Sequence, residues 1–284
     1  MVARKWVPMV LLVFAVLACL SELGAQSPPD DEALWREFMG WFKTVPSVRT
    51  SPFTAWAAAQ KAAGTAEPEI RRQMGVLVKL MMERSDWVEL YYDKTFSVPL
   101  SGNPEADGFL STAPSAMLVE AISGLSPGTA LDAGMGQGRN AVYLARQGWK
   151  VTGFDLSSEA ITAASANAST AGVHVDTVKA SYADFDFGTA RWDLIVLTFA
   201  WAPVDDPAFV DRLRTSLRPQ GRIVFEHFGD DPAHPRPTAM HALKPGQLRQ
   251  RFASFRLDRY EEVVGLGEWG GPDSNLVRMV AVKQ

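Results

Sequence analysis

From Thr129 to Phe228, short apolar runs alternate with stretches in which apolar residues recur every three or four positions. The short runs predict buried strands, and the three-and-four spacing predicts amphipathic helices. Because strands and helices alternate, the pattern predicts right-handed crossovers and a parallel sheet with helices on both faces. The expected strands are 129–133, 150–155, 174–180, 192–199 and 221–228, with helices between them at 139–147, 158–171 and 207–217.

The last part of the chain departs from this alternation. A helix is expected at 244–252, and two strands follow it at 255–264 and 276–283. The glycine-rich stretch 265–275 joins these strands without a helix, so they should run antiparallel. The sheet is therefore expected to have seven strands, mostly parallel, with an antiparallel last strand.

Upstream of the sheet, the chain shows helical spacing without strand signals, and proline and glycine separate the segments. We interpret residues 26–112 as a helical N-terminal extension. It either covers one edge of the main domain, or closes over its site or docks another protein. The expected elements are helices at 32–45, 53–63 and 69–92, a lid-like loop at 95–112, and a helix at 113–124 that opens the main domain, 113–284.

Residues 1–25 have the layout of an export signal. Arg4 and Lys5 precede an apolar run without charge that is short for a membrane span. Cleavage after Ala25 would release a periplasmic or secreted protein. The stretch that ends at Cys19 is also similar to a bacterial lipobox, so lipidation at Cys19, or an uncleaved signal, would attach the protein to a membrane.

Composition narrows the chemistry. The formal net charge of −4 shows no basic excess, so a nucleic-acid partner is not favoured. The one cysteine of the chain lies in the signal, which excludes disulfides and cysteine–zinc sites from the folded domain. Asp230, Asp231 and His234 are too few and too irregularly spaced to predict a metal site, and no metal is expected.

Three glycines at alternate positions, Gly134, Gly136 and Gly138, separate the first strand from its helix. Glycine allows a sharp turn and a close approach of the backbone to a ligand, and the helix N-terminus attracts negative charge. The second strand ends in Asp155, whose carboxylate can accept hydrogen bonds from ribose hydroxyls. The combination predicts a nucleoside-binding site.

Two cofactor classes fit this loop. The run from Gly136 to Ala141 matches the dinucleotide fingerprint, which would make the protein an NAD(P)-dependent oxidoreductase. However, Asp132 precedes the first glycine, where a carboxylate would repel a pyrophosphate and attract a cationic aminoacyl group. A third alternative is a non-catalytic exported binding module that retains the fold.

The spacing Asp-x-Gly-x-Gly-x-Gly from Asp132 resembles the first motif of class I S-adenosylmethionine-dependent methyltransferases. The run Gly136-Gln-Gly-Arg-Asn140, followed by Tyr143-Leu-Ala145, is similar to the tellurite-resistance and thiopurine methyltransferase branch. The resemblance implies a Rossmann-like three-layer sandwich and S-adenosylmethionine as cofactor.

The resemblance also implies where the parts of the cofactor would lie. The glycine loop would carry the methionine moiety, Asp132 would favour its cationic groups, and Asp155 would hold the ribose. Adenine would meet Leu156 and the turn after the third strand, where Ser181 replaces the usual acid and Asp184 is a less favoured candidate. The expected cofactor-binding residues are Asp132, Gly134, Met135, Gly136, Gly138, Asn140, Asp155, Leu156, Ser181, Tyr182, Ala183 and Thr198.

The segment after the fourth strand should face the transferred methyl group. There, Trp201 and Phe199 are candidates for cation–π contact with a sulfonium, or for simple packing. His227 is a candidate general base, or a hydrogen-bonded structural histidine. Four upstream aromatic residues would either wall a small substrate or pack: Tyr91, Tyr92, Phe96 and Phe109.

The acceptor is expected to be a small molecule that receives the methyl group by in-line displacement. The Asn/Asp-Pro-Pro-Tyr/Phe signature of adenine methyltransferases is missing from the sequence. Positioning supplies most of the acceleration of such a displacement.

Overall fold

The computed structural model describes residues 31–46, 52–101, 103, 107, 110–230, 242–267 and 271–284. The chain forms two compact units, Met1–Tyr91 and Tyr92–Gln284. No helix in these described ranges is both long and apolar enough to cross a membrane. The expected export signal, with Cys19 and Ala25, lies outside them, as do Phe109, Asp231 and His234. Export, lipidation and the domain boundaries at 25 and 112 stay predictions.

The first unit is helical and is organised around aromatic side chains. Phe38 is 2% exposed, and its ring centroid lies within 6 Å of five other aromatic rings. Those rings belong to Trp35, Trp41, Phe42, Phe53 and Trp56. The helices are α2 (Asp31–Thr44), α3 (Pro52–Ala62), α4 (Glu67–Glu83) and α5 (Val88–Phe96), the last of which ends in the second unit.

The prediction of one helix over 69–92 is wrong, because the chain turns between α4 and α5. Arg84 is extended, with φ −122° and ψ 154°. The indole Nε1 of Trp87 lies 3.1 Å from the Met81 carbonyl oxygen and 3.0 Å from that of Arg84. This side chain satisfies carbonyls at the end of α4, so the helix stops there.

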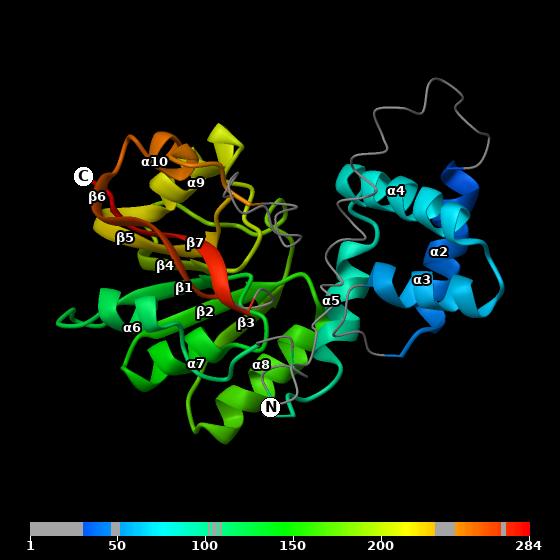
Figure 1. The fold of residues 1–284 in the computed structure, drawn as a ribbon. Coiled ribbons are helices and arrows are strands. Elements are labelled where there is room, and N and C mark those ends of the chain that lie inside the picture. Colours follow the sequence, from blue (N-terminus) through cyan, green and yellow to red (C-terminus); the bar gives the residue numbers. More distant parts are fainter. Residues whose placement is uncertain are drawn as a thin grey trace, which may run out of the picture. The chain divides into compact units, whose positions relative to one another are not determined.

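The second unit is built on a seven-stranded sheet in the order β3-β2-β1-β4-β5-β7-β6 (Figure 1). The first five strands of that order are parallel, and β7 is antiparallel to both of its neighbours. The predicted mixed sheet is confirmed. Its strands are β1 (Thr129–Ala133), β2 (Lys150–Asp155), β3 (Asp176–Lys179), β4 (Trp192–Thr198), β5 (Leu217–Phe228), β6 (Arg256–Gly267) and β7 (Gly271–Val282).

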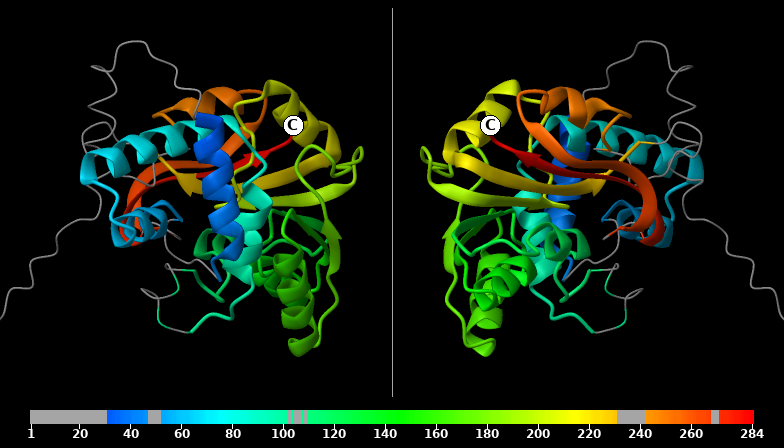
Figure 2. Two further views of the ribbon diagram at one scale, coloured as in Figure 1. Left: turned by 90° about the vertical axis from the view of Figure 1, so that its right-hand side faces the viewer. Right: turned by 90° about the vertical axis from the view of Figure 1, so that its left-hand side faces the viewer.

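Helices cover both faces of this sheet, which gives the predicted three layers (Figure 2). Side chains of α9, such as Leu213, and of α10, such as Leu248, share one apolar core with strand residues. Side chains of α6, α7 and α8, such as Leu118 and Leu144, form the core on the other face. These helices are α6 (Ala116–Ala121), α7 (Arg139–Arg146), α8 (Ser158–Thr170), α9 (Pro207–Ser216) and α10 (Gln247–Arg251).

The last two strands are longer than the sequence pattern predicts. Residues expected in a joining loop at 265–275 pair across the strands, as Gly265 does with Ser274 and Gly267 with Gly271. A β-carbon on Gly267 would lie 2.7 Å from the Ser274 side chain, so glycine here permits close strand approach rather than a turn. The expected loop was wrong for this physical reason.

At the amino ends of the strands, Asp193 joins β1 to β4 and β5. Its Oδ2 accepts from Thr129 N at 2.7 Å and from Thr129 Oγ1 at 2.9 Å, and Arg218 Nη1 lies 2.6 Å away. Ligands of parallel sheets bind at the opposite edge. Asp193 is therefore part of the scaffold rather than of a ligand site.

We expect Asp193→Ala to lower the free energy of unfolding by about 1–2 kcal/mol, because a partly buried backbone N–H loses its acceptor. Chemical denaturation measures the change. Asp176→Ala is the matched control, since Asp176 bonds the exposed His174 and should change stability by less than about 0.5 kcal/mol. Equal losses in the two variants would contradict the scaffold role.

Candidate functional site

The carboxyl ends of β1, β2 and β4 meet at the point where the strand order reverses. From β1 the chain moves to β2 and β3 on one side, and then returns to β4 on the other. Open parallel sheets bind ligands in the crevice outside such a switch point. The predicted residues Asp132, Asp155 and Thr198 lie at or near these three strand ends.

The glycine loop has the conformation that its sequence predicts. Gly134, Gly136 and Gly138 have φ values of +70°, +54° and +78°, in the left-handed region where side chains are strained. Gly134 N and Met135 N both donate to the Phe154 carbonyl oxygen, at 2.9 and 3.0 Å. The loop is therefore fixed to the end of β2.

Protein side chains lie against all three glycines of this loop. A β-carbon added to any of the three would lie about 3 Å or less from a neighbouring atom. Packing therefore requires glycine here, in addition to the backbone angles. The nearest neighbours are Tyr182 Oη and Ala200 Cβ for Gly134, Phe96 Cζ for Gly136, and Ala164 Cβ for Gly138.

Asp155 lies beneath the loop with its carboxylate directed at backbone donors. Its Oδ2 accepts from Gly136 N and its Oδ1 from Ser157 N, both at 2.9 Å. A carboxylate has about four acceptor positions, which leaves capacity for a diol. Ser157, rather than Asp155, caps α8 by accepting from Ala160 N at 3.1 Å.

Both acidic residues of the crevice are buried. Asp155 is 8% exposed and Asp132 is 2% exposed, and Asp132 Oδ2 accepts from Ala141 N at 2.9 Å. Burial raises the pKa of Asp132 to about 7, although Arg139 and the Ala141 N–H act in the opposite direction. Burial also raises the pKa of Asp155, against the hydrogen bonds from Ser157 and Gly136.

The Gln-Gly-Arg-Asn part of the motif holds the segment that leads into α6. Gln137 Nε2 donates to the Ser111 carbonyl at 3.0 Å, and Arg139 Nη1 donates to the Ala113 carbonyl at 2.8 Å. Asn140 Oδ1 accepts from Ser115 N, the backbone N–H just before α6. The side chains of Gln137, Arg139 and Asn140 therefore form hydrogen bonds within the protein.

Asn140 links that segment to β4. Its Oδ1 accepts from Ser115 N at 2.9 Å, and its Nδ2 donates to Thr198 Oγ1 at 2.7 Å. Asn140 and Thr198 were both predicted as cofactor-binding residues. The structure brings them together, with the amide of Asn140 directed at Ser115 and Thr198.

A partly buried ion pair extends these polar contacts from β4 to β5 and β7. Thr198 is in register with Glu226 on β5, and Glu226 with Arg278 on β7. Glu226 Oε1 accepts from Arg278 Nε at 2.7 Å, and its Oε2 accepts from Ser115 Oγ at 2.9 Å. The sequence gives no signal for these contacts, because Ser115 and Glu226 are 111 positions apart.

The hydroxyl group of Ser181 stabilises the turn after β3. Ser181 Oγ donates to Asp184 Oδ2 at 2.6 Å and accepts from Ala183 N and Asp184 N, each at 3.2 Å. Ser181 and Asp184, the two candidates for the adenine amine, thus lie together. Ala183 is exposed on this turn, and Leu156 is half-buried after β2.

Tyr182 spans the crevice between β1 and β4. Its hydroxyl lies 3.0 Å from the Ala133 carbonyl oxygen and 2.7 Å from that of Ala200, and its ring packs edge-on against Phe154. Burial raises the pKa of this phenol well above its usual range. Another predicted residue, Met135, packs its side chain over Gly153 in the core.

The segment after β4 has a strained backbone. Phe199 and Trp201 adopt φ values of +52° and +47°, which are unfavourable for aromatic residues. Such strain persists where surrounding structure enforces it, often at functional sites. Trp201 is 37% exposed, and its ring lies 5.6 Å from the imidazole of His227.

His227 is 5% exposed and its Nδ1 accepts from the Phe228 N–H at 2.6 Å. In the neutral ring this places the proton on Nε2. Nε2 is then a donor, which does not suit a general base acting through that nitrogen. The structure thus places His227 near Trp201 but gives it the hydrogen bonding of a structural histidine.

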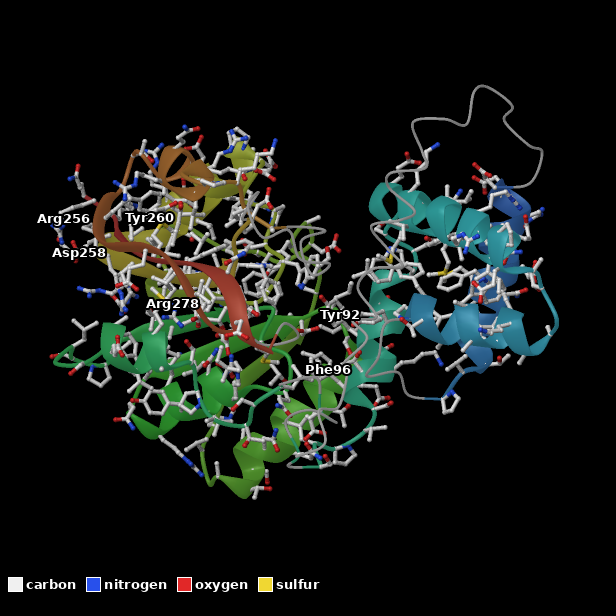
Figure 3. The ribbon with its side chains drawn as sticks, viewed as in Figure 1. Tyr92, Phe96, Arg256, Asp258, Tyr260 and Arg278 are labelled. Carbon is white, nitrogen blue, oxygen red and sulfur yellow. The ribbon has the colours of Figure 1, made fainter. Side chains whose placement is uncertain are left out.

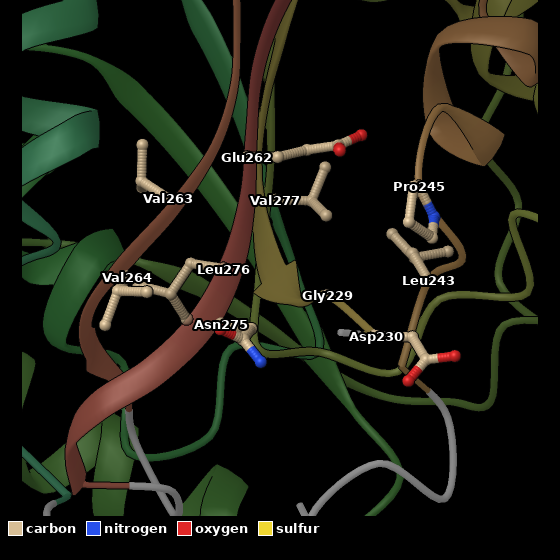
Figure 4. A pocket seen from close by; sticks show the side chains of 10 residues that line it. All are labelled: Gly229, Asp230, Leu243, Pro245, Glu262, Val263, Val264, Asn275, Leu276 and Val277. Atoms are coloured by element: carbon tan, nitrogen blue, oxygen red, sulfur yellow. The ribbon is translucent and has the colours of Figure 1, made fainter. Parts of the chain in front are cut away.

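A pocket of about 250 Å³ lies at the end of β5, beside β6 and β7 (Figure 4). It contains the carboxyl groups of Asp230 and Glu262 among apolar side chains. Glu262 accepts from Gly246 N at 2.7 Å and from the Tyr260 hydroxyl at 2.6 Å. None of the predicted cofactor-binding residues lines this pocket.

Comparisons with known proteins agree with the fold of the second unit. Residues 130–221 match the model of a methyltransferase domain. The structure is similar to TehB from Haemophilus influenzae, with 21% identity, a TM-score of 0.52, and coverage of 61% of this chain and 64% of that one. The predicted resemblance is confirmed at the level of the fold: the chain has the class I methyltransferase fold, and residues 130–221 match the methyltransferase domain model.

Particular relatives extend this finding. A 1,6-didemethyltoxoflavin-N1-methyltransferase from Burkholderia thailandensis, with S-adenosylhomocysteine bound, is 22% identical with a TM-score of 0.52, over 72% of this chain and 89% of that one. The predicted cofactor agrees with these findings.

Two curated proteins match by sequence. Hemagglutinin 1 of Eikenella corrodens is 29% identical over 154 residues, which are 52% of this chain. Ribosomal RNA small subunit methyltransferase C of Alcanivorax borkumensis is 46% identical over 52 residues, which are 17% of this chain. The matches span 50% and 16% of those two proteins.

The pKa of Asp132 predicts a pH dependence of stability. Because its folded-state pKa of about 7 exceeds the ordinary 3.8, its stabilising contribution is complete below 3.8 and is lost as pH rises through 7. We expect the free energy of unfolding to fall by on the order of 2 kcal/mol between about pH 5 and pH 7, relative to Asp132→Asn. Denaturant titrations at several pH values measure this difference. Parallel pH profiles for the two proteins would contradict it.

Proposed function

We propose that this protein is an S-adenosylmethionine-dependent methyltransferase that transfers a methyl group to a small-molecule acceptor. The observation that carries the proposal is the buried Asp155 carboxylate, bonded to Gly136 N at 2.9 Å, at the switch point of a class I methyltransferase sheet. That group can accept both ribose hydroxyls without losing its present donors.

The residues of the crevice fit such a cofactor. When bound, S-adenosylmethionine supplies an electrophilic methyl group on a sulfonium. Asp155 would hold the ribose, and the carboxylates of Asp132 and Asp155 favour a ligand that carries positive charge. Only Asp132 bears on the NAD(P)-dependent alternative, because a carboxylate before the first glycine disfavours a pyrophosphate, whereas an acid at the end of the second strand suits either cofactor.

The chain's own contribution to the reaction is positioning. Asn140 holds the Thr198 hydroxyl at 2.7 Å, and the Glu226 carbonyl accepts from Phe199 N at 2.7 Å, so the segment after β4 is fixed from two sides. A fixed wall orients an acceptor for in-line attack, which is the main source of acceleration in such a step. Because the neutral His227 ring donates from Nε2, an acceptor that is already nucleophilic suits this site best.

Two observations support a small acceptor. The formal net charge of −4 does not favour a nucleic acid, and the toxoflavin methyltransferase with the same fold acts on a small heterocycle. The short match to an RNA methyltransferase covers only 16% of that enzyme. An acceptor panel of thiols, amines, phenols and oxyanions is therefore the first choice for activity assays.

Calorimetric titration of the full chain tests the proposal. We expect micromolar binding of S-adenosylmethionine and of S-adenosylhomocysteine, and no binding of NAD. Asp155→Ala should weaken both by at least about tenfold, since hydrogen bonds to a charged acceptor contribute about 1.5–3 kcal/mol.

Asp155→Asn is the matched variant, because it keeps one acceptor oxygen for Gly136 or Ser157 and loses the charge. Its affinity should lie between those of the wild type and Asp155→Ala, and its melting temperature should fall, because one of the two buried N–H groups loses its acceptor. If the protein binds NAD but neither S-adenosylmethionine nor S-adenosylhomocysteine, the NAD(P)-dependent oxidoreductase is the better interpretation. Tight binding without methylation of any acceptor would favour the non-catalytic module.

A further inference from the structure

The last turn of α5 lies on the cofactor crevice within the second unit. Phe96 Cζ would be 3.0 Å from a β-carbon on Gly136, so the ring is in contact with the glycine whose N–H donates to Asp155. Tyr92 stacks on Phe96 with ring centroids 6.2 Å apart and an interplanar angle of 18°. Figure 3 shows both rings on this helix. Phe96 thus covers the glycine loop, and Tyr92 packs behind it.

A carboxylate fixes this turn in place. Asp93 Oδ1 accepts from Ser157 Oγ at 2.7 Å and from Glu159 N at 3.3 Å, at the N-terminus of α8. Ser157 N in turn donates to Asp155 Oδ1. Asp93 and Asp155 therefore both bind Ser157, Asp93 through its hydroxyl and Asp155 through its backbone N–H, and this contact helps to hold the turn that carries Phe96.

Three carboxyl groups and two cations lie near the two rings. Asp93, Asp132 and Asp155 converge on the crevice from α5, β1 and β2. The cations are Lys94, on the same turn of α5, and Arg139, whose Nη1 donates to the Ala113 carbonyl. Aromatic faces and carboxylates both attract cations, and they do so more strongly where water is excluded.

From this geometry, and resting on the proposed function, we propose that the last turn of α5 recognises the positive charge of the cofactor. Phe96 supplies an aromatic wall for the sulfonium, and Asp93 positions that wall and adds negative charge. The turn therefore favours the charged S-adenosylmethionine over its neutral demethylated product, which assists product release. It is a determinant of specificity between the two forms of one ligand.

Calorimetric titration of the full chain with each nucleoside tests this proposal. The measured quantity is the ratio of the dissociation constant of S-adenosylhomocysteine to that of S-adenosylmethionine. Phe96→Leu keeps an apolar side chain but removes the π face, and should lower this ratio about three- to tenfold, as expected for a partly desolvated cation–π contact. Phe96→Tyr keeps the π face and should retain the ratio.

Asp93→Asn separates charge from position. Asparagine still offers an acceptor oxygen to Ser157 Oγ, so the turn stays in place while its negative charge is lost. The ratio should fall by a factor of two or more, a coupling expected of a charge at close range. An analogue with a protonated amine in place of the sulfonium should lose affinity in parallel with S-adenosylmethionine in both variants.

Tyr91→Leu is the matched control, because Tyr91 is one residue before this turn and packs against Trp87 in the first unit. It should leave the ratio unchanged. Equal weakening of both nucleosides by Phe96→Leu would reduce Phe96 to packing and overturn the proposal, and tighter binding of both would show that the ring obstructs the site. If the wild type binds neither nucleoside, the proposed function itself fails.

Discussion

The candidate site depends on the hydrogen bond from Gly136 N to the buried Asp155 carboxylate. This bond ties the loop after β1 to the end of β2, and it holds a charge where water is scarce. Burying a carboxylate is unfavourable unless donors compensate, and the backbone N–H groups of Gly136 and Ser157 supply them. The left-handed glycines follow from this arrangement, because the loop must turn its N–H groups inward.

Much of the sheet could be predicted because its strands have local signatures. The central strand Leu194–Leu197 is a continuous apolar run, and the acid at 155 follows another. Where glycine has a meaning that depends on a distant partner, prediction fails: Gly267 looks like a turn residue and instead makes room for Ser274 across the hairpin. The break before α5 likewise depends on hydrogen bonds from the Trp87 indole to the carbonyl groups of Met81 and Arg84.

The candidate site divides in the same way. Glycines and acids at strand ends can be found in the sequence, because their spacing reflects the backbone itself. The roles of Gln137, Arg139 and Asn140 cannot, since their partners lie about 25 residues upstream along the chain. These side chains resemble a cofactor motif, yet in the structure they fasten the segment before α6 to the crevice. A shared motif can therefore preserve the frame of a site rather than contacts to its ligand.

This frame explains how one crevice can be rigid and still discriminate. Asn140 Nδ2 and the Glu226 carbonyl hold Thr198 and Phe199, and Asp93 holds the turn that carries Phe96, each through a hydrogen bond of 2.7 Å. The two ligands differ by a single methyl group, and contact with one methyl group separates ligands only modestly. Charge separates them better, because a sulfonium and a thioether differ by a full unit of charge. In the proposed function, the carboxyl groups of α5, β1 and β2 and the Phe96 ring would use that difference, with residues that the fold already holds in place.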